Sequence, residues 1–322
     1  MKILYVDGFN FFYRCLNKDK LSQDKKGEPM GGTVSFFRQL FFTMNTLMPT
    51  KVVICWDGDS AGERRRKLYS GYKSKRGRHK VKTYDMGYQN ISNEDTQYIE
   101  ILKILEYLPV EIYKVDYLEA DDLIQYFVAK NKGEGVIQYI ASTDQDYLQC
   151  VEKDVYVWNP ETKLLMDGRK IEEKFGFMSD NFIWYKIIKG DDSDEIPGVN
   201  GIALKTMLKI FPEIQQQKID SLQDLLYLIE NKEGKGVALQ NLKNSAGLLT
   251  RNYQLMRLSE SNINYKRIEE IENQNQMQSE IKFEPGLLDI HLIRKGFYVY
   301  FKDFSYIKKI FLLINTKQKL KV

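Results

Sequence analysis

Three carboxylates stand within four residues at Glu119, Asp121 and Asp122, directly before an apolar run at residues 123–129. The run predicts a helix that packs inward, and the amides at a helix N-terminus favour negative charge. That preference explains one or two acids but not three, because close carboxylates repel and burial raises the cost. An all-oxygen set suits Mg²⁺ or Mn²⁺. Taken alone, the cluster is equally consistent with a cation site and with a solvated acidic helix cap.

More acids follow apolar runs that read as strands. Asp7 and Asp57 each end such a run and each precedes a glycine, and Asp144 and Asp146 follow another run. In open α/β sheets, residues at the carboxyl ends of parallel strands gather at one edge. We therefore expect these acids to lie close together. For Asp7 alone, capping of the next helix is an equally good explanation.

The elements that must position these acids alternate along the first half of the chain. Apolar strand patterns and amphipathic helix patterns follow one another, which predicts an α/β fold with a largely parallel sheet and helices on both faces. A small hairpin is expected around Asn159 and Pro160. The expected strands cover residues 2–6, 51–56, 110–115 and 135–142, and the expected helices cover residues 10–16, 33–47 and 93–108.

Residues 60–83 carry ten Lys or Arg side chains and a single acid, Glu63, with Tyr69 and Tyr72 interleaved. A solvated helix normally mixes charges of both signs. Charge of one sign with aromatic residues is better explained by phosphate contacts and base stacking. The stretch therefore favours nucleic-acid contact over a merely solvated loop.

A second candidate site lies at residues 190–206, where Asp191 and Asp194 precede a turn that contains Gly198 and Gly201. The turn joins a helix at residues 180–189 to a helix at about 203–211. Glycines allow close backbone approach, and amides at a helix N-terminus can bind phosphate. An ordinary tight interhelical turn is the alternative. Beyond it we expect helices at residues 219–230, 234–258, 286–295 and 303–313, and a polar loop at residues 269–280.

Composition limits the possible classes of protein. The chain has 322 residues, 43% hydrophobic content and a formal net charge of +4. Three scattered cysteines form neither a disulfide framework nor a zinc pattern and fit a reducing compartment. With only two histidines, a His-based metal site is not expected. No apolar run reaches membrane-spanning length, and the first residues read as a strand rather than a signal peptide. We therefore expect a cytoplasmic protein, in the host cell if a phage encodes it.

Taken together, these blocks resemble the 5′-nucleases of the flap endonuclease superfamily. The resemblance extends to the free-standing phage enzymes of RNase H type and to the 5′-nuclease domain of bacterial DNA polymerase I. It covers residues 1 to about 252, with six blocks in the expected order. The blocks contain Val6, Asp7, Gly8 and Arg14; Trp56, Asp57 and Gly58; Tyr72 to Arg76; Glu119 to Asp122; Ser142 to Asp146; and Gly190 to Thr206.

The resemblance implies a role for each matching residue. Two divalent ions, Mg²⁺ with Mn²⁺ as a substitute, are expected in a catalytic carboxylate centre. The acids nearest the first ion are Asp7, Asp57, Glu119 and Asp121. The acids around the second ion are Asp122, Asp144, Asp146, Asp191 and Asp194. Lys73 and Arg76 match a catalytic basic pair near the scissile phosphate. The expected DNA contacts are Arg14, Arg65, Lys67, Tyr72, Lys73, Lys75, Arg76, Gly198, Val199, Gly201, Ile202, Lys205 and Thr206.

The implied architecture is a PIN-like nuclease domain at residues 1–178 and a helical DNA-binding domain at residues 179–322. A basic helical arch is expected at about 60–92 and a helix–three-turn–helix element at about 180–211. In relatives this element holds K⁺ through backbone carbonyls. Two positions depart from the family pattern, since Glu195 stands where Asn is usual and Ala203 stands where Gly is usual. The second departure bears on the K⁺ site.

The implied function is a structure-specific 5′-3′ exonuclease and flap endonuclease that removes RNA primers or 5′ flaps in DNA replication. It would act as a monomer on branched or nicked duplexes, beside a separate polymerase and a single-strand binding protein. A non-catalytic DNA-binding protein would have lost acids, and all nine are present. A PIN-type ribonuclease would lack the residues 190–206, and an acidic Ca²⁺-binding protein would show loop repeats.

Overall fold

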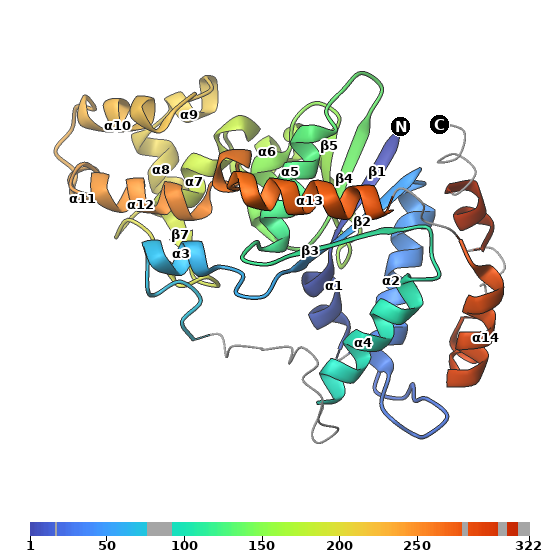
Figure 1. Cartoon of the computed structure of the whole chain (residues 1–322). Coiled ribbons are helices and arrows are strands. Elements are labelled where there is room, and N and C mark those ends of the chain that lie inside the picture. Colours follow the sequence, from blue (N-terminus) through green and yellow to red (C-terminus); the bar gives the residue numbers. More distant parts are fainter. Residues whose placement is uncertain (17, 76–91, 279–282, 302–307, 315–322) are drawn as a thin grey trace.

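A six-stranded sheet forms the centre of the molecule (Figure 1). The computed structural model describes residues 1–16, 18–75, 92–278, 283–301 and 308–314. The strand order is β3-β2-β1-β4-β5-β6, in which the first five strands are parallel and β6 is antiparallel. The strands are β1 (Lys2–Asp7), β2 (Lys51–Asp57), β3 (Glu111–Val115), β4 (Ile137–Ala141), β5 (Val155–Asn159) and β6 (Leu164–Met166). The predicted mostly parallel sheet and the hairpin are confirmed.

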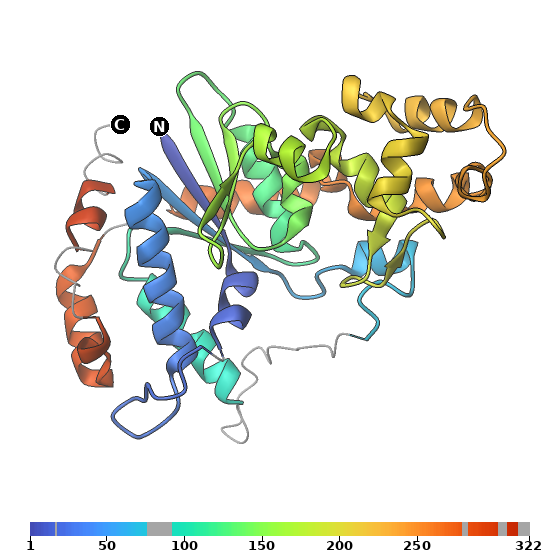
Figure 2. The same cartoon turned by 180° about the vertical axis from the view of Figure 1, so that it is seen from behind.

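One face of the sheet carries the side chains of Leu4 and Val6, which are fully buried. Side chains alternate between the two faces of a strand, so these residues pack with the helices that follow β1 and β2. The helices of this face are α1 (Gly8–Cys15), α2 (Gly31–Leu47) and α4 (Asn93–Leu105). In Figure 2, α1 and α2 (dark to mid blue) lie together on one side of the strands.

The opposite face carries Ile3 and Tyr5, which belong to a separate core cluster. It is covered by α5 (Ala120–Lys130), and the cluster continues into α7 (Phe182–Lys189). Because helices lie on both faces, the central strands β1, β2 and β4 are buried on both sides. This explains the continuous apolar runs in their sequences.

The second half of the chain is largely helical and extends from one end of the sheet (Figure 1). The helix predicted at residues 234–258 is two helices, because the chain turns at Asn244 and Ser245. The short pair β7 (Gly190–Asp191) and β8 (Ile196–Pro197) lies between α7 and α8. The helices of this half are α8 (Leu204–Ile210), α9 (Glu213–Gln216), α10 (Leu222–Glu230), α11 (Val237–Lys243) and α12 (Ala246–Met256).

The loop predicted at residues 269–280 is wrong, since most of it lies in α13 (Tyr265–Met277). This helix runs along the outer edge of β3 (Figure 1). The amide of Gln278 accepts from Ile112 N at 2.5 Å and donates to Ile112 O at 2.7 Å. Gln274 donates to Lys114 O at 2.8 Å. The polar side chains therefore pair with an edge strand whose backbone groups would otherwise lack partners.

The helix α14 (Pro285–Lys295) packs on the α2 side of the sheet through Leu288 and Leu292. On the same helix, His291 lies 2.5 Å from Glu100 of α4. Helix α13 thus lies against the sheet edge and α14 lies against α4, and the division of the chain at residue 178 stays a prediction. The expected helix at residues 303–313 is helical at 308–314, and its first part lies outside the described residues.

The remaining short elements are α3 (Glu63–Leu68) and α6 (Gly168–Phe175), together with four 3-10 turns. Helix α3 contains part of the basic stretch. Residues 76–91 of the expected arch, including Arg76, lie outside the described residues. None of the described helices has both the length and the apolar character that a membrane crossing needs.

Candidate active site

Asp7 and Asp57 are the last residues of two neighbouring parallel strands, β1 and β2. Asp7 accepts hydrogen bonds from Asn10 N and from the Tyr147 hydroxyl, both at 3.1 Å. It therefore caps α1, as the alternative interpretation of the sequence allowed, and it also faces the strand ends. Asp57 accepts from Ala120 N at 2.7 Å, which joins the end of β2 to the start of α5.

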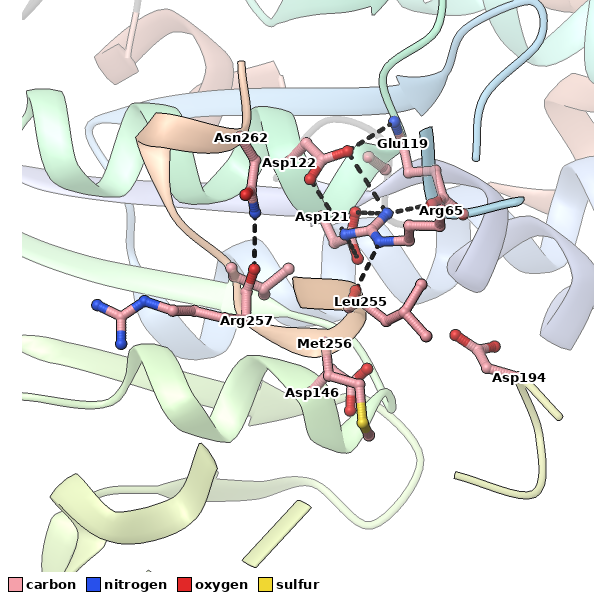
Figure 3. A network of polar contacts seen from close by, with 12 residues as sticks. Arg65, Glu119, Asp121, Asp122, Asp146, Asp194, Leu255, Met256, Arg257 and Asn262 are labelled. Atoms are coloured by element: carbon pink, nitrogen blue, oxygen red, sulfur yellow. Dashed lines mark hydrogen bonds and ion pairs between the residues drawn. The ribbon is translucent and has the colours of Figure 1, made fainter. Parts of the chain in front are cut away.

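The acids Glu119, Asp121 and Asp122 stand at the N-terminus of α5, and their carboxylate oxygens lie within 4.8 Å of one another. Arg65 lies among them and pairs with all three, at 3.1 Å from both Asp121 and Asp122 (Figure 3). Its Nε atom also donates to Leu255 O at 3.0 Å. One buried guanidinium thus supplies the positive charge that three close carboxylates require.

The structure places Arg65 and Tyr72 away from the surface, although the sequence suggested contact with DNA. Only 2% of Arg65 and 1% of Tyr72 is exposed. The Tyr72 hydroxyl donates to Glu119 at 3.1 Å. Burial follows from the acids, because a cation or hydroxyl that faces them replaces their lost hydration. As placed, the two residues position Glu119, and their contact with DNA stays a prediction.

Lys73 joins the basic stretch to the acids. Its Nζ atom donates to Glu119 at 2.6 Å and lies 3.8 Å from Asp194, and its backbone N donates to Asp194 O at 3.0 Å. Glu195 holds the same turn, because it accepts from the Ser74 hydroxyl and from Lys75 N. Its role was missed, although its departure from the family pattern marked the position. Its φ of +59° is one that Asn adopts readily.

Asp144 and Asp146 follow β4 and begin the 3-10 turn η1 (Gln145–Cys150). Lys186 of α7 lies 2.6 Å from Asp146 and also pairs with Asp191. The sequence analysis missed Lys186, which is buried. Its signal was a lysine within an apolar helix five residues before Asp191, since buried lysines are almost always paired.

Several of these acids hold their protons more tightly than usual. Burial, with repulsion from Asp57, raises the pKa of Asp7 to about 7. Burial and repulsion from Glu119 raise the pKa of Asp57 to about 6. Burial also raises the pKa of Asp144 to about 6. Within the described part of the chain, none of the three forms an ion pair with a cationic side chain.

Other acids of the cluster are held ionised. Burial alone would raise the pKa of Glu119, but the charges of Arg65 and Lys73 lower it far below its usual value. The charge of Lys186 likewise outweighs burial and lowers the pKa of Asp191 to about 2. Among the described residues, nine carboxylates thus meet four cations, Arg64, Arg65, Lys73 and Lys186. This excess of buried negative charge, all of it on oxygen, fits a divalent cation.

The turn between α7 and α8 uses its glycines in two different ways. A Cβ atom on Gly198 would lie 1.9 Å from Lys189 O, so this glycine permits close packing against α7. Gly201 has a φ of +79° and open space around it. The amides of Val199 and Ile202 are already bonded, to Ile188 O and Val199 O. Of the expected phosphate contacts in this turn, the open surface at Gly201 is therefore the best placed.

Other expected DNA contacts lie on the surface. Lys205 is exposed on α8 and Thr206 is half-buried there, while Lys67 is exposed on α3. Arg14 pairs with Glu161 at 3.0 Å. Asn252, which the sequence analysis did not select, is fully buried and donates to Ile187 O and Pro197 O. These two hydrogen bonds fix the backbone of the turn.

Comparison with solved structures shows the fold. The chain is similar to a complex of the bacteriophage T5 flap endonuclease with DNA and metal ions, with a TM-score of 0.66 and 21% identity. The match covers 87% of this chain and 100% of that chain. A T5 5′-exonuclease structure with bound zinc gives the same TM-score and identity. Such identity supports the common fold and says nothing about individual side chains.

Comparison with protein sequences shows the family. The model for the 5′-3′ exonuclease N-terminal resolvase-like domain matches residues 2–176. A 5′-3′ exonuclease of Aquifex aeolicus is 30% identical over 227 residues, which are 70% of this chain and 73% of the relative. DNA polymerase I of Borreliella burgdorferi is 28% identical over 85% of this chain and 28% of its own length. The chain therefore belongs to the 5′-3′ exonuclease family.

Proposed function

We propose that the carboxylate cluster is the catalytic centre of a metal-dependent 5′-nuclease that hydrolyses phosphodiesters near the 5′ end of branched or nicked duplexes. The observation that carries this proposal is the excess of carboxylates over cations at one sheet edge. Asp7, Asp57 and Asp144 lie there without a cationic partner among the described residues, and Asp7 and Asp57 are half-buried. A structural cluster would instead be neutralised, as Arg65 neutralises the acids of α5.

Asp7, Asp57 and Asp144 would hold the divalent cations, because the other acids of the cluster already have side-chain cations. Mg²⁺ is the expected ion, two per site, and Mn²⁺ is the expected substitute. A divalent ion supplies Lewis-acid activation of the phosphate and a more acidic attacking water. Support comes from the T5 nuclease structures described above, which contain bound metal ions.

The chain's own residues would position the substrate. Lys73 lies at the junction of the acids and the basic stretch, where its ammonium can neutralise charge on a phosphate oxygen. Arg65, Tyr72 and Lys186 would keep individual carboxylates ionised and oriented. None of the described contacts of this cluster involves a histidine, and a metal-bound water would need no histidine base.

The duplex would be held by the turn between α7 and α8 and by Lys205, and the expected K⁺ would bind to backbone carbonyls of this turn. RNA primers and 5′ flaps would be the natural substrates of an enzyme with this geometry. A separate polymerase and a single-strand binding protein are the partners we propose for a monomeric enzyme. A family of DNA-processing relatives that includes DNA polymerase I supports this setting.

Asp144→Asn tests the catalytic assignment. It keeps the shape of the side chain and removes one negative charge, so cleavage of a labelled 5′-flap duplex in Mg²⁺ should fall by about a hundredfold or more. Flap affinity in EDTA should stay within a factor of about three. Asp180→Asn is the matched control, because Asp180 is a surface acid near Lys218. Full activity of Asp144→Asn would refute the assignment.

A further inference from the structure

A cavity of about 520 Å³ lies beside the catalytic cluster, between α3 and the segment that follows α12. Its walls include three cations, and none of the described residues that line it is acidic. The cationic residues are Arg64, Lys67 and Arg257, and the polar and apolar walls include Ser259, Ser261, Tyr253 and Leu68. Such a lining favours an anion that also carries an apolar part.

The cations of this cavity are held in place by neutral or weak contacts. Arg64 donates to Gln254 O at 3.2 Å and lies 3.9 Å from Asp122, which fixes it between the cavity and the catalytic acids. Arg257 stacks over the Tyr253 ring at 5.3 Å. Among the described residues, Lys67 pairs with Glu63 on the exposed surface of α3, and such a pair contributes little. The charges of Lys67 and Arg257 therefore remain available to a ligand.

The cavity is separate from the carboxylates although it adjoins them. Figure 3 shows the side chain of Arg257 pointing away from Asp121 and Asp122. Arg65 donates to Leu255 O, and Asn262 donates to Arg257 O at 2.7 Å, so the segment between these residues forms a wall between the two sites. A chain-like substrate could therefore contact both sites at once.

We propose that this cavity binds a backbone phosphodiester of the nucleic-acid substrate, at a position away from the scissile bond. The guanidinium groups and Lys67 would contact the phosphate oxygens, the serine hydroxyls would donate to them, and the sugar would pack on Leu68. A nucleic acid is favoured over an acidic peptide because the adjoining cluster requires a phosphate backbone in the same region. The inference rests on the proposed function and extends it.

The test measures affinity for a 5′-flap duplex in EDTA at several salt concentrations, so that cleavage plays no part. Arg257→Glu and Lys67→Glu should each lower the affinity about tenfold and reduce the magnitude of the salt slope by about one. Arg169→Glu is the matched control for Lys67→Glu, because each cation forms an exposed i,i+4 pair with one glutamate. The control should leave both quantities unchanged.

Single neutral methylphosphonates, placed one at a time along each strand, identify the bound phosphate. At one position, the methylphosphonate should weaken binding by the wild type but cause no further loss of affinity in Arg257→Ala. This variant keeps the backbone contact to Asn262. Independent effects at every position, or wild-type affinity and slope in the Arg257 and Lys67 variants, would overturn the inference. If these variants also cut the flap normally, the proposed function stands without this subsite. Protein that neither binds nor cuts a flap refutes the proposed function itself.

Discussion

Asp7 shows how one carboxylate can serve both the fold and the chemistry. Its Oδ1 atom caps α1 through Asn10, while Oδ2 faces Ser142 and Tyr147. The hydrogen bonds favour the ionised form, yet burial and the nearby Asp57 oppose it more strongly and raise the pKa to about 7. At neutral pH, a cation that binds beside Asp7 would therefore strongly stabilise the ionised form of this side chain.

This balance predicts how stability depends on pH in the metal-free protein. Burial raises the pKa of Asp57 to about 6, and burial with repulsion from Asp144 raises the pKa of Asp146 to about 7. An unfolded aspartate has a pKa near 4, so the folded state binds these protons more tightly. Stability must then fall as pH rises from about 4 to about 7. Thermal unfolding in EDTA should show a Tm that is lower at pH 7.5 than at pH 5.

Added Mg²⁺ should reverse the trend, with a larger rise in Tm at pH 7.5 than at pH 5, because the ion competes with protons. Because the pKa values of Glu119 and Asp191 are lowered, these two groups titrate below this pH range and do not change the trend within it. Asp7→Asn is the informative variant, since it removes one titrating group and should flatten the dependence. A Tm independent of pH and of Mg²⁺ in the wild type would contradict the electrostatic account.

At the level of elements, α13 is a helix that is held in place by its contacts with the neighbouring strand β3. Its sequence is polar, and Ile271 is its only fully buried apolar residue among those described. What holds the helix is a row of amide side chains that bind the backbone of β3. An unpaired edge strand is a site for unwanted strand addition, and this helix closes it.

Gln278→Leu should destabilise the protein by about 2 kcal/mol, because it leaves the N–H and C=O of Ile112 without partners. Asn273→Leu is the control on the same helix, at an exposed position. Urea unfolding of both variants gives the two free energies. Equal values would mean that water replaces the glutamine amide, and that α13 does not seal the edge.

The elements that could be predicted were those with a periodic apolar pattern. We could predict the strands that end at Asp7 and Asp57, together with their carboxylates. Each apolar run and its acid are adjacent in the sequence. Helix α13 was predicted wrongly as a loop, Lys186 was missed and the burial of Arg65 was not foreseen, since their environment comes from contacts across the fold. A polar helix has no apolar stripe to detect, and a lysine or arginine reads as solvated until its distant partners are known.

At the scale of the whole molecule, the proposed catalytic cluster and the turn proposed to hold the duplex lie in different halves of the chain but share α7 and the Asp191–Asp194 segment. Lys186 of α7 pairs with acids of both halves. Cleavage and binding should therefore be separable at residues that are far from this junction. Lys205, which is exposed on α8, is such a residue.

Lys205→Glu should weaken flap affinity in EDTA about tenfold and reduce the magnitude of the salt slope by about one, because each phosphate contact releases counterions. The rise in Tm with Mg²⁺ should be unchanged, since the carboxylates are intact. Lys218→Glu, which changes an exposed lysine near Asp180, is the control. If affinity and slope are unaffected by Lys205→Glu, the duplex does not contact α8.

The hydrogen bonds between the glutamine side chains and the backbone of β3 also have a consequence for synthesis on the ribosome. Gln278 follows its partner Ile112 by 166 residues. At a translation rate of about 5–20 residues per second, the β3 edge would wait on the order of 10–30 s for its cover. During that interval the nascent sheet has an open edge beside its acidic cluster, and repulsion between like-charged chains on neighbouring ribosomes would help to keep those edges apart.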